Sequence, residues 1–320
     1  GRPKRDGHPL TGKPVLDASG EPVMVPGTLK AVKAIGWFIQ EYGVAQVSMN
    51  LVDLNVTPVH VAFDEVCRAA EARGVRVTGS ELVGLVPLAA LLDAGRHYLR
   101  KQQRSVGVSE AELIKIAVKS LGLDELGPFK PEERIIEYRL RDTGLSRLVN
   151  LSVRDFAEET ASESVAPGGG SVAAAVGALG ASLGTMVANL SAHKRGWDER
   201  WEEFSGWAEK GQRIKDELLR LVDDDTRAFD RVMAALGMPK STDAEKSARS
   251  AALAAANLGA LQVPWQVMQT AFGAFELIRA MAEQGNPASA SDAGVGALCT
   301  RAAIRGAWLN VRTNASGVKD

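Results

Sequence analysis

The sequence predicts an α+β N-terminal subdomain, in which a partial sheet packs with helices, followed by an all-α domain that forms a helical bundle. Strand-like and helical segments alternate up to about Tyr138, whereas only helical patterns follow it. The length of 320 residues also fits two domains of about 150 residues each. We expect domains at 1–140 and 149–320, joined by a linker over 141–148.

The N-terminal region combines strands with helices. Val44–Leu51 is typical of a strand, and Val75–Thr78 predicts a second, shorter strand. Helical spacing of apolar residues predicts helices over His60–Arg73, Pro87–Gln103 and Glu110–Leu121. Alternation of this kind favours a layer of strands and helices over a bundle.

Only helices are predicted in the C-terminal region. Ser152 and Asp155 have the spacing of a capping box, which predicts that a helix begins there. Pro264 is expected to open a new helix, because proline fits the first helical position. The predicted helices cover 152–164, 171–192, 199–236, 243–262, 264–283 and 292–312.

The composition is that of an ordinary globular protein with little net charge. Hydrophobic residues make up 45% and the formal net charge is −1, so neither nucleic acid nor an anionic membrane is an expected partner. Cys67 and Cys299 form no Cys-x-x-Cys motif, and the four histidines lack metal-ligand spacing. We therefore expect no bound metal. No signal or transit sequence is recognisable, which favours a cytoplasmic location.

One segment, Val172–Leu190, is nearly long enough to cross a membrane and carries no charge. Alanine and glycine dominate it, and Ser182, Thr185 and Asn189 interrupt it. Small residues allow neighbouring helices to approach closely. We expect this segment to be the central helix of a soluble bundle.

Asp225 interrupts the apolar face of a helix predicted over 204–236. That face has apolar residues mostly three or four positions apart, namely Phe204, Trp207, Ile214, Leu218, Val222, Phe229, Val232 and Leu236. The neighbouring carboxylates project about 100° and 200° around the axis, so at least Asp223 is expected to reach water. Burial raises the pKa of a carboxyl group, which suits proton transfer. The alternative is a core aspartate neutralised by a lysine, an arginine or a helix N-terminus.

Three consecutive glycines, Gly168, Gly169 and Gly170, directly precede a predicted helix. Glycines let the backbone approach a ligand closely, and the free N–H groups of a helix N-terminus attract anions or carbonyl oxygens. The segment Pro167–Ser171 therefore predicts a binding loop that includes Ser171. A tight turn between two antiparallel helices is the structural alternative.

Two sets of motifs resemble a known enzyme family. Val47–Leu51, Thr78–Pro87, Leu121–Asp124 and Pro131–Tyr138 resemble the C-terminal subdomain of glutamate formiminotransferase. Ala166–Ala174, Leu221–Phe229 and Pro239–Lys240 resemble the formiminotetrahydrofolate cyclodeaminase domain. Their order is that of the bifunctional formiminotransferase-cyclodeaminases.

This resemblance implies a cytoplasmic, homo-oligomeric folate enzyme of histidine degradation. In such enzymes one half transfers a formimino group from formiminoglutamate to tetrahydrofolate. The other half closes formiminotetrahydrofolate to methenyltetrahydrofolate and releases ammonia. The transferase histidine of the family lies in an N-terminal subdomain that we do not recognise in this sequence. None of the four histidines of this sequence matches the position of that histidine. Transferase activity is therefore expected only of a longer protein.

The resemblance also implies roles for individual residues. Asp225 is the third member of the Leu-Val-Asp-Asp-Asp run and matches the cyclodeaminase carboxylate of the family. The loop of Gly168–Gly170 with Ser171 is expected to hold part of the tetrahydrofolate, which acts as substrate and carrier. Lys240 and Lys194 are assigned to the carboxylates of its glutamate tail.

Two other functions remain open at the level of sequence. A methenyltetrahydrofolate cyclohydrolase would open the same ring with water. A non-catalytic oligomerisation scaffold would use the small-residue helix and the tryptophan-rich segment 197–207 for subunit packing.

Overall fold

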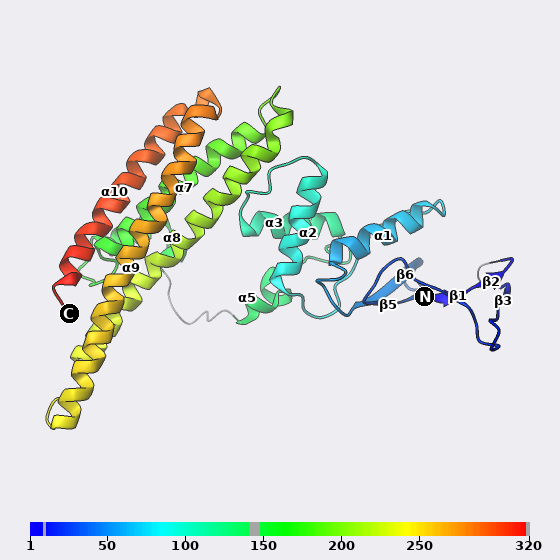
Figure 1. Ribbon diagram of the computed structural model, residues 1–320, viewed down its shortest axis with the longest axis horizontal. Coiled ribbons are helices and arrows are strands. Elements are labelled where there is room, and N and C mark those ends of the chain that lie inside the picture. The colour runs from blue at the N-terminus through cyan, green and yellow to red at the C-terminus, as the bar shows by residue number, and fades with distance from the viewer. Residues whose placement is uncertain (9–10, 141–147, 318–320) are drawn as a thin grey trace. The chain divides into compact units, whose positions relative to one another are not determined.

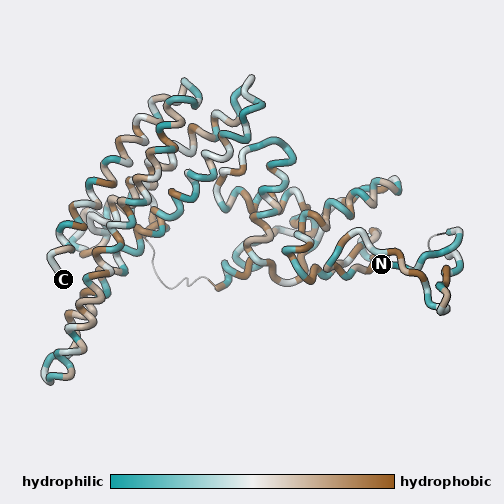
Figure 2. The backbone as a smooth tube through the Cα atoms, in the orientation of Figure 1, coloured by the Kyte–Doolittle hydropathy of each residue, from teal (hydrophilic) through white to brown (hydrophobic). Residues whose placement is uncertain are grey.

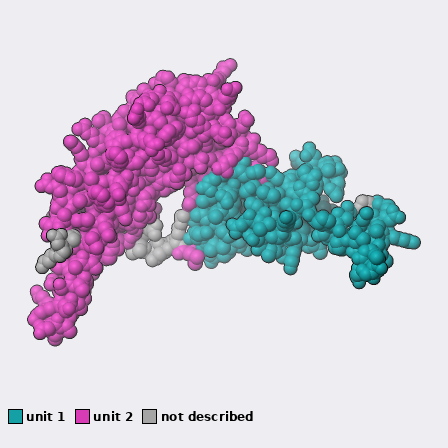
Figure 3. Space-filling view, viewed as in Figure 1, with its two compact units in different colours: residues 1–97, 114–139 teal, residues 98–113, 140–320 magenta. Residues whose placement is uncertain are grey.

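The computed structural model describes residues 1–8, 11–140 and 148–317, and it divides into two compact units (Figure 3). The first consists of Gly1–His97 and Ile114–Arg139, and the second of Tyr98–Leu113 and Leu140–Asp320. The second unit thus includes Tyr98–Leu113, which the sequence places in the range 1–140. Nearly all of the expected linker, residues 141–147, lies outside the described residues.

The described strands lie in the first unit and form antiparallel pairs. Short strands β1 (Arg2–Pro3) and β4 (Met24–Val25) pair with each other, as do β2 (Arg5–Asp6) and β3 (Lys13–Pro14). The longer hairpin pairs β5 (Val32–Ile39) with β6 (Val44–Leu51). The partial sheet is therefore a set of separate two-stranded ribbons (Figure 1).

The strand predictions are partly correct. The bounds of β6 are those predicted, whereas β5 is not predicted because its apolar residues do not alternate regularly. The predicted strand at Val75–Thr78 is wrong, since this segment has no regular secondary structure. No described strand pairs with it, and a strand is stabilised by its cross-strand neighbours.

Three of the described helices before residue 141 confirm those predicted from the spacing of apolar residues, and the two short helices that follow them are not predicted. The helices are α1 (Val59–Glu71), α2 (Leu88–Lys101), α3 (Glu110–Leu121) and the short α4 (Pro131–Arg134) and α5 (Ile136–Leu140). Gly74 and Gly122 follow α1 and α3 with φ of 75° and 62°. Glycine adopts this left-handed conformation readily, which explains why both helices end there.

The second unit is dominated by four long helices that run side by side (Figure 1). Its described elements are η1 (Leu148–Asn150), α6 (Val153–Thr160), α7 (Gly169–Ala192), η2 (Asp198–Arg200), α8 (Trp201–Leu236), α9 (Asp243–Gln284), η3 (Pro287–Ser289) and α10 (Ala290–Ala315). Ser152 caps α6 as predicted, because its hydroxyl accepts a hydrogen bond from the Asp155 N–H. Helices α7 and α9 each contact both α8 and α10.

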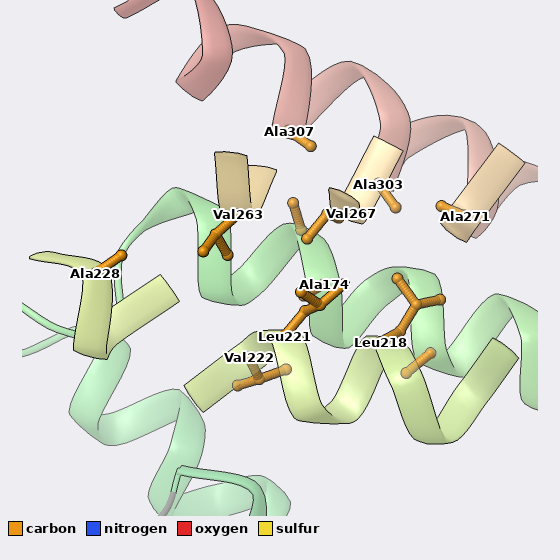
Figure 4. Packing of buried hydrophobic residues seen from close by; sticks show 12 residues of the cluster. Ala174, Leu218, Leu221, Val222, Ala228, Val263, Val267, Ala271, Ala303 and Ala307 are labelled. Atoms are coloured by element: carbon orange, nitrogen blue, oxygen red, sulfur yellow. The ribbon is translucent and has the colours of Figure 1, made fainter. Parts of the chain in front are cut away.

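Small residues line most of the bundle core (Figure 4). Leu218, Leu221 and Val222 of α8 are almost fully buried against alanines of the other helices, among them Ala174 and Ala303. Helix α7 is long and apolar enough to cross a membrane, but 61% of its most apolar window is buried inside the bundle. Packing in the core therefore accounts for its composition, as a central helix requires.

The prediction of separate helices over 243–262 and 264–283 is wrong, because α9 continues through Pro264. Proline has no N–H for the carbonyl group four residues earlier, which is that of Ala260. The Asn314 side chain of α10 donates to this carbonyl oxygen instead, at 2.7 Å. A tertiary contact thus replaces the missing helical hydrogen bond.

The apolar face predicted for residues 204–236 is buried only in part. Phe229 is 37% exposed and Leu236 is 45% exposed, whereas Phe204 and Leu218 are fully buried. Figure 1 shows the connection between α8 and α9 extending beyond the ends of α7 and α10. Figure 2 shows that the connection itself is hydrophilic. The last turns of α8 therefore lack neighbours that would cover their apolar side chains.

Candidate active site

Asp225 lies on α8 against the first turn of α7. Its Oδ2 accepts a hydrogen bond from the Ser171 backbone N–H at 2.8 Å. The Ser171 hydroxyl has two acceptors within reach, the Val222 carbonyl oxygen at 2.9 Å and Asp225 Oδ2 at 3.1 Å. None of the described residues donates to Oδ1. One carboxylate oxygen thus binds the helix N-terminus, and the other remains available to a ligand.

Gly170 makes this close approach possible. A Cβ atom on Gly170 would lie only 2.2 Å from Asp225 Oδ1 and 2.5 Å from its Cγ. Any side chain at this position would therefore displace the carboxylate. Gly168 and Gly169 differ from it: a Cβ on Gly168 would meet open space, and one on Gly169 would lie 3.4 Å from Asn310 Nδ2.

The surroundings of Asp225 favour its protonated form more than water does. Burial raises the pKa of this carboxyl group above its ordinary value of 3.8, and the hydrogen bonds from Ser171 oppose that rise only in part. The group is therefore closer than an exposed aspartate to the range in which a side chain both accepts and donates protons.

A cavity of about 420 Å³ adjoins Asp225. Sites for small organic ligands commonly occupy about 300–1,000 Å³. The glycine loop and helices α8, α9 and α10 form its walls. The lining residues are Val165, Ala166, Gly168, Gly169, Gly170, Asp225, Thr226, Ala228, Phe229, Val232, Asn257, Ala260, Asn310, Thr313, Asn314, Ser316 and Gly317.

Three asparagines give this cavity a wall of hydrogen-bond acceptors. The amide nitrogen of Asn310 donates to the Gly306 carbonyl at 3.0 Å, that of Asn257 to the Gly317 carbonyl at 3.0 Å and that of Asn314 to the Ala260 carbonyl at 2.7 Å. Only an amide nitrogen can bind a carbonyl oxygen, so these contacts fix the orientation of each amide group. Each side-chain oxygen is left to accept from a ligand. Sequence reasoning missed these residues. Asn257 lies on α9, and Asn310 and Asn314 lie on α10, so only the packing of the two helices brings them to one cavity.

The prediction that Asp223 reaches water is wrong. Asp223 is only 8% exposed, and its Oδ1 accepts a hydrogen bond from the Leu148 N–H at 2.8 Å. The segment that contains η1 covers this face of α8, which helical geometry alone cannot indicate. Asp224 forms ion pairs with Arg220 and Arg227. Of the three consecutive carboxylates, Asp225 is the one that lines the cavity.

The structure brings together five of the seven residues that the sequence assigns to the site: Asp225, Gly168, Gly169, Gly170 and Ser171. Lys194 follows the opposite end of α7, about 36 Å from the glycine loop for a helix of 24 residues. Its ammonium group lies over the Trp197 ring, 4.0 Å from the centroid. Lys240 is exposed in the connection between α8 and α9 and does not line the cavity.

Within the described residues, no group of three or more His, Cys, Asp or Glu side chains has an arrangement that could hold a metal ion. The polar side chains that line the cavity are mainly asparagines, Thr226 and Asp225. Amide oxygens and a single carboxylate suit an organic ligand with N–H groups.

Comparison with known proteins identifies the family. A model of the formiminotransferase-cyclodeaminase family matches residues 152–320, and a model of the formiminotransferase domain matches residues 11–141. The chain belongs to the formiminotransferase-cyclodeaminase family. It is 40% identical over 299 residues to the formimidoyltransferase-cyclodeaminase of Gallus gallus. The aligned residues cover 92% of this chain and 54% of that protein. The chain thus spans about half the length of the bifunctional relatives that it matches.

Two further relatives match about half of this chain. The methenyltetrahydrofolate cyclohydrolase of Methylorubrum extorquens is 39% identical over 171 residues, which cover 53% of this chain and 82% of that protein. The crystal structure of formiminotetrahydrofolate cyclodeaminase from Thermotoga maritima is 30% identical with a TM-score of 0.48, and the match covers 53% of this chain and 81% of that one. The two family models, which match residues 11–141 and 152–320, confirm over both regions the family resemblance stated from sequence motifs.

Proposed function

We propose that the helical domain is a formiminotetrahydrofolate cyclodeaminase in which Asp225 transfers the proton. The observation that carries the proposal is the carboxylate of Asp225, held by Ser171 through one oxygen and open to a cavity through the other. Membership of the formiminotransferase-cyclodeaminase family supports the substrate class. Tetrahydrofolate, with a formimino group, is the proposed substrate and one-carbon carrier.

In the proposed reaction, the aniline nitrogen of the folate attacks the formimino carbon and forms a tetrahedral intermediate. Asp225 accepts the proton that this nitrogen loses and delivers it to the amino group, which leaves as ammonia. One carboxyl group serves both steps because both nitrogens are bonded to the same carbon. The oxygen that carries the proton is Oδ1, since Ser171 occupies Oδ2.

The asparagine wall is the proposed contact of the pterin ring. A tetrahydropterin carries N–H groups on its ring nitrogens and an exocyclic amino group, all of which are donors. The oxygens of Asn257, Asn310 and Asn314 are acceptors whose orientation the backbone contacts fix. Phe229 and Val232 supply apolar surface for the ring face.

Other features of the proposal extend beyond the cavity. Lys240 is exposed about 16 Å or more from Asp225, as 11 residues of α8 separate Asp225 from Leu236. Only a glutamate tail that leaves the cavity could reach its ammonium group.

We propose that formiminoglutamate serves the transferase of a longer protein. A homo-oligomer in the cytoplasm is part of the same proposal.

A cyclohydrolase is the second candidate, because the Methylorubrum extorquens relative with this activity matches most of its own length. The same carboxyl group would then activate water for attack on methenyltetrahydrofolate. A non-catalytic scaffold is the third candidate, and it requires no folate at all.

A comparison of two substrates tests the proposal. The chain is incubated separately with formiminotetrahydrofolate and with methenyltetrahydrofolate, and ammonia, methenyl product and hydrolysis product are measured. We expect ammonia release to exceed the uncatalysed rate and to saturate with substrate. Hydrolysis of methenyltetrahydrofolate without ammonia release would identify a cyclohydrolase. If neither folate binds saturably, the scaffold interpretation replaces both enzymes.

A further inference from the structure

Pro264 lies in the interior of a helix, where proline is unfavourable. Helix α9 runs from Asp243 to Gln284, and Pro264 is the proline inside it. Proline disfavours a helix interior because it donates no hydrogen bond and because its ring crowds the carbonyl group four residues earlier. A residue that opposes the local structure around it points to a role beyond that structure.

The carbonyl group that Pro264 affects is that of Ala260, which lines the Asp225 cavity. A helix bonds each carbonyl oxygen to the N–H group four residues later, and proline has no N–H group to offer. Crowding by the proline ring also favours a carbonyl group that tilts away from the helix axis. The Ala260 oxygen accepts a hydrogen bond from Asn314 Nδ2 of α10 instead, at 2.7 Å.

This contact determines the orientation of the Asn314 amide group. Because Nδ2 binds a carbonyl oxygen, the amide cannot be reversed. Asn314 itself lines the cavity. Among the described residues no group donates to Asn314 Oδ1, and this oxygen is accessible rather than buried. The Ala260 carbonyl therefore holds the Asn314 oxygen as an open acceptor at the cavity.

A second contact between the same two helices keeps Asn314 within reach of Ala260. The Asn257 amide nitrogen of α9 donates to the carbonyl oxygen of Gly317, which follows α10, at 3.0 Å. Asn257, Ala260 and Pro264 are three and four positions apart, so they share one face of α9. Pro264 is buried and does not line the cavity, so its effect on a ligand would pass through Ala260 and Asn314.

We propose that Pro264 is a positioning residue for the ligand of the Asp225 cavity. Because it lacks an N–H group, it leaves the Ala260 carbonyl oxygen to Asn314, and Asn314 presents its own oxygen to a donor of the ligand. An alanine at position 264 would donate to Ala260 and compete with Asn314. The effect on catalysis rests on the proposed cyclodeaminase function, whereas the contact between the helices does not.

A double-mutant cycle in urea denaturation tests the contact without any substrate. Asn314→Leu leaves the Ala260 carbonyl without a donor, so this variant should unfold at a lower urea concentration than the unchanged protein. In Pro264→Ala the new N–H group supplies a donor, so the addition of Asn314→Leu should lower the midpoint much less. Equal shifts in the two backgrounds would overturn the proposal.

The kinetics of ammonia release from formiminotetrahydrofolate test the effect on the ligand. Pro264→Ala should raise KM about 3-fold and leave kcat unchanged, because it weakens one neutral hydrogen bond and does not touch Asp225. The same substitution should leave KM unchanged when Asn314→Leu is already present, because the oxygen that it misplaces is then missing. An equal rise in KM in both backgrounds would show a merely structural role and would also overturn the proposal.

Pro287→Ala is the matched control, since Pro287 is exposed and opens η3 at a position where a helix needs no N–H group. This variant should leave KM and kcat unchanged. If Asn314→Leu does not fold, Pro264→Ala alone decides, because alanine suits a helix interior, and an unchanged KM would then refute the positioning role. If the unchanged protein releases no ammonia, the proposed function is wrong, and the urea cycle still decides whether Pro264 positions Asn314.

Discussion

Helix α8 places two aspartates, two positions apart in sequence, in different surroundings. Asp223 faces the segment around η1 and accepts the Leu148 N–H in a buried position. Asp225 faces the first turn of α7 and accepts the Ser171 N–H, but it also borders a cavity. Both carboxylates accept a hydrogen bond from a backbone N–H group, so this contact does not distinguish them. The difference is the second oxygen of Asp225, which the fold leaves open to a ligand.

Exchange of each carboxylate for an amide gives the largest expected contrast. Asp225→Asn should lower kcat for cyclodeamination about 10²- to 10⁴-fold, because the amide still accepts the Ser171 N–H but cannot carry a proton. Asp223→Asn is the matched control and should leave kcat within a few-fold. The measurement is ammonia release from formiminotetrahydrofolate. A normal rate in Asp225→Asn would remove this residue from the mechanism.

The second prediction concerns the approach of α7 to Asp225. Gly170→Ala should lower kcat/KM about 100-fold, since its Cβ would displace the carboxylate and a shift of about 1 Å can cost this much. Gly206→Ala is the control, because a Cβ at that position of α8 would meet open space. Both variants should unfold at a denaturant concentration close to that of the unchanged protein. If Gly170→Ala keeps full activity, the position of Asp225 is not what limits catalysis.

The pH dependence of activity should report the environment of Asp225. The base must be ionised to accept a proton, so kcat/KM should fall as pH decreases through the pKa of this group, which burial raises above 3.8. The hydrogen bonds from Ser171 lower that pKa. Ser171→Ala removes the hydroxyl donor and should therefore move the acid limb of the profile to higher pH. A limb that stays in place or moves to lower pH would contradict the assignment.

The cavity wall should affect binding more than chemistry. Asn310→Leu removes one acceptor and should raise KM about 3- to 10-fold with little change in kcat, as expected for one neutral hydrogen bond. Asn150→Leu, at an exposed position of η1, is the control. A fall in kcat with unchanged KM would instead place Asn310 among the groups that act during the reaction.

Periodicity predicts local features of this chain well. The capping box at Ser152, the strand at Val44–Leu51 and the inward position of Asp225 follow from residue spacing. The continuation of α9 through Pro264 does not, because it depends on a hydrogen bond from Asn314, fifty residues later in the chain. The burial of Asp223 does not follow from residue spacing either, because it depends on the contact with Leu148, 75 residues earlier in the chain.

Tertiary contacts also decide which predicted site residues meet. Ser171 of the glycine loop and Asp225 are 54 residues apart in sequence. The family resemblance pointed to both, the apolar stripe pointed to Asp225, and the three consecutive glycines pointed to the loop. The three asparagines carry no such signal, since asparagine is common at surface positions. Lys194 was assigned to the site but lies far from it. It follows the C-terminal end of α7, whereas the glycine loop lies at the N-terminal end of the same helix.

The smallest expected effect concerns stability alone and completes the comparison of the two aspartates. Asp223→Ala should lower the free energy of unfolding by about 1–3 kcal/mol, because the Leu148 N–H would lose its acceptor in a buried position. Asp223→Asn keeps an acceptor oxygen and should cost less. Urea denaturation measures both values, and the pH profile of the remaining activity should match that of the unchanged protein. A shifted acid limb in Asp223→Ala would show that the contact at Leu148 also determines the environment of Asp225, and the two faces of α8 would then act as one site.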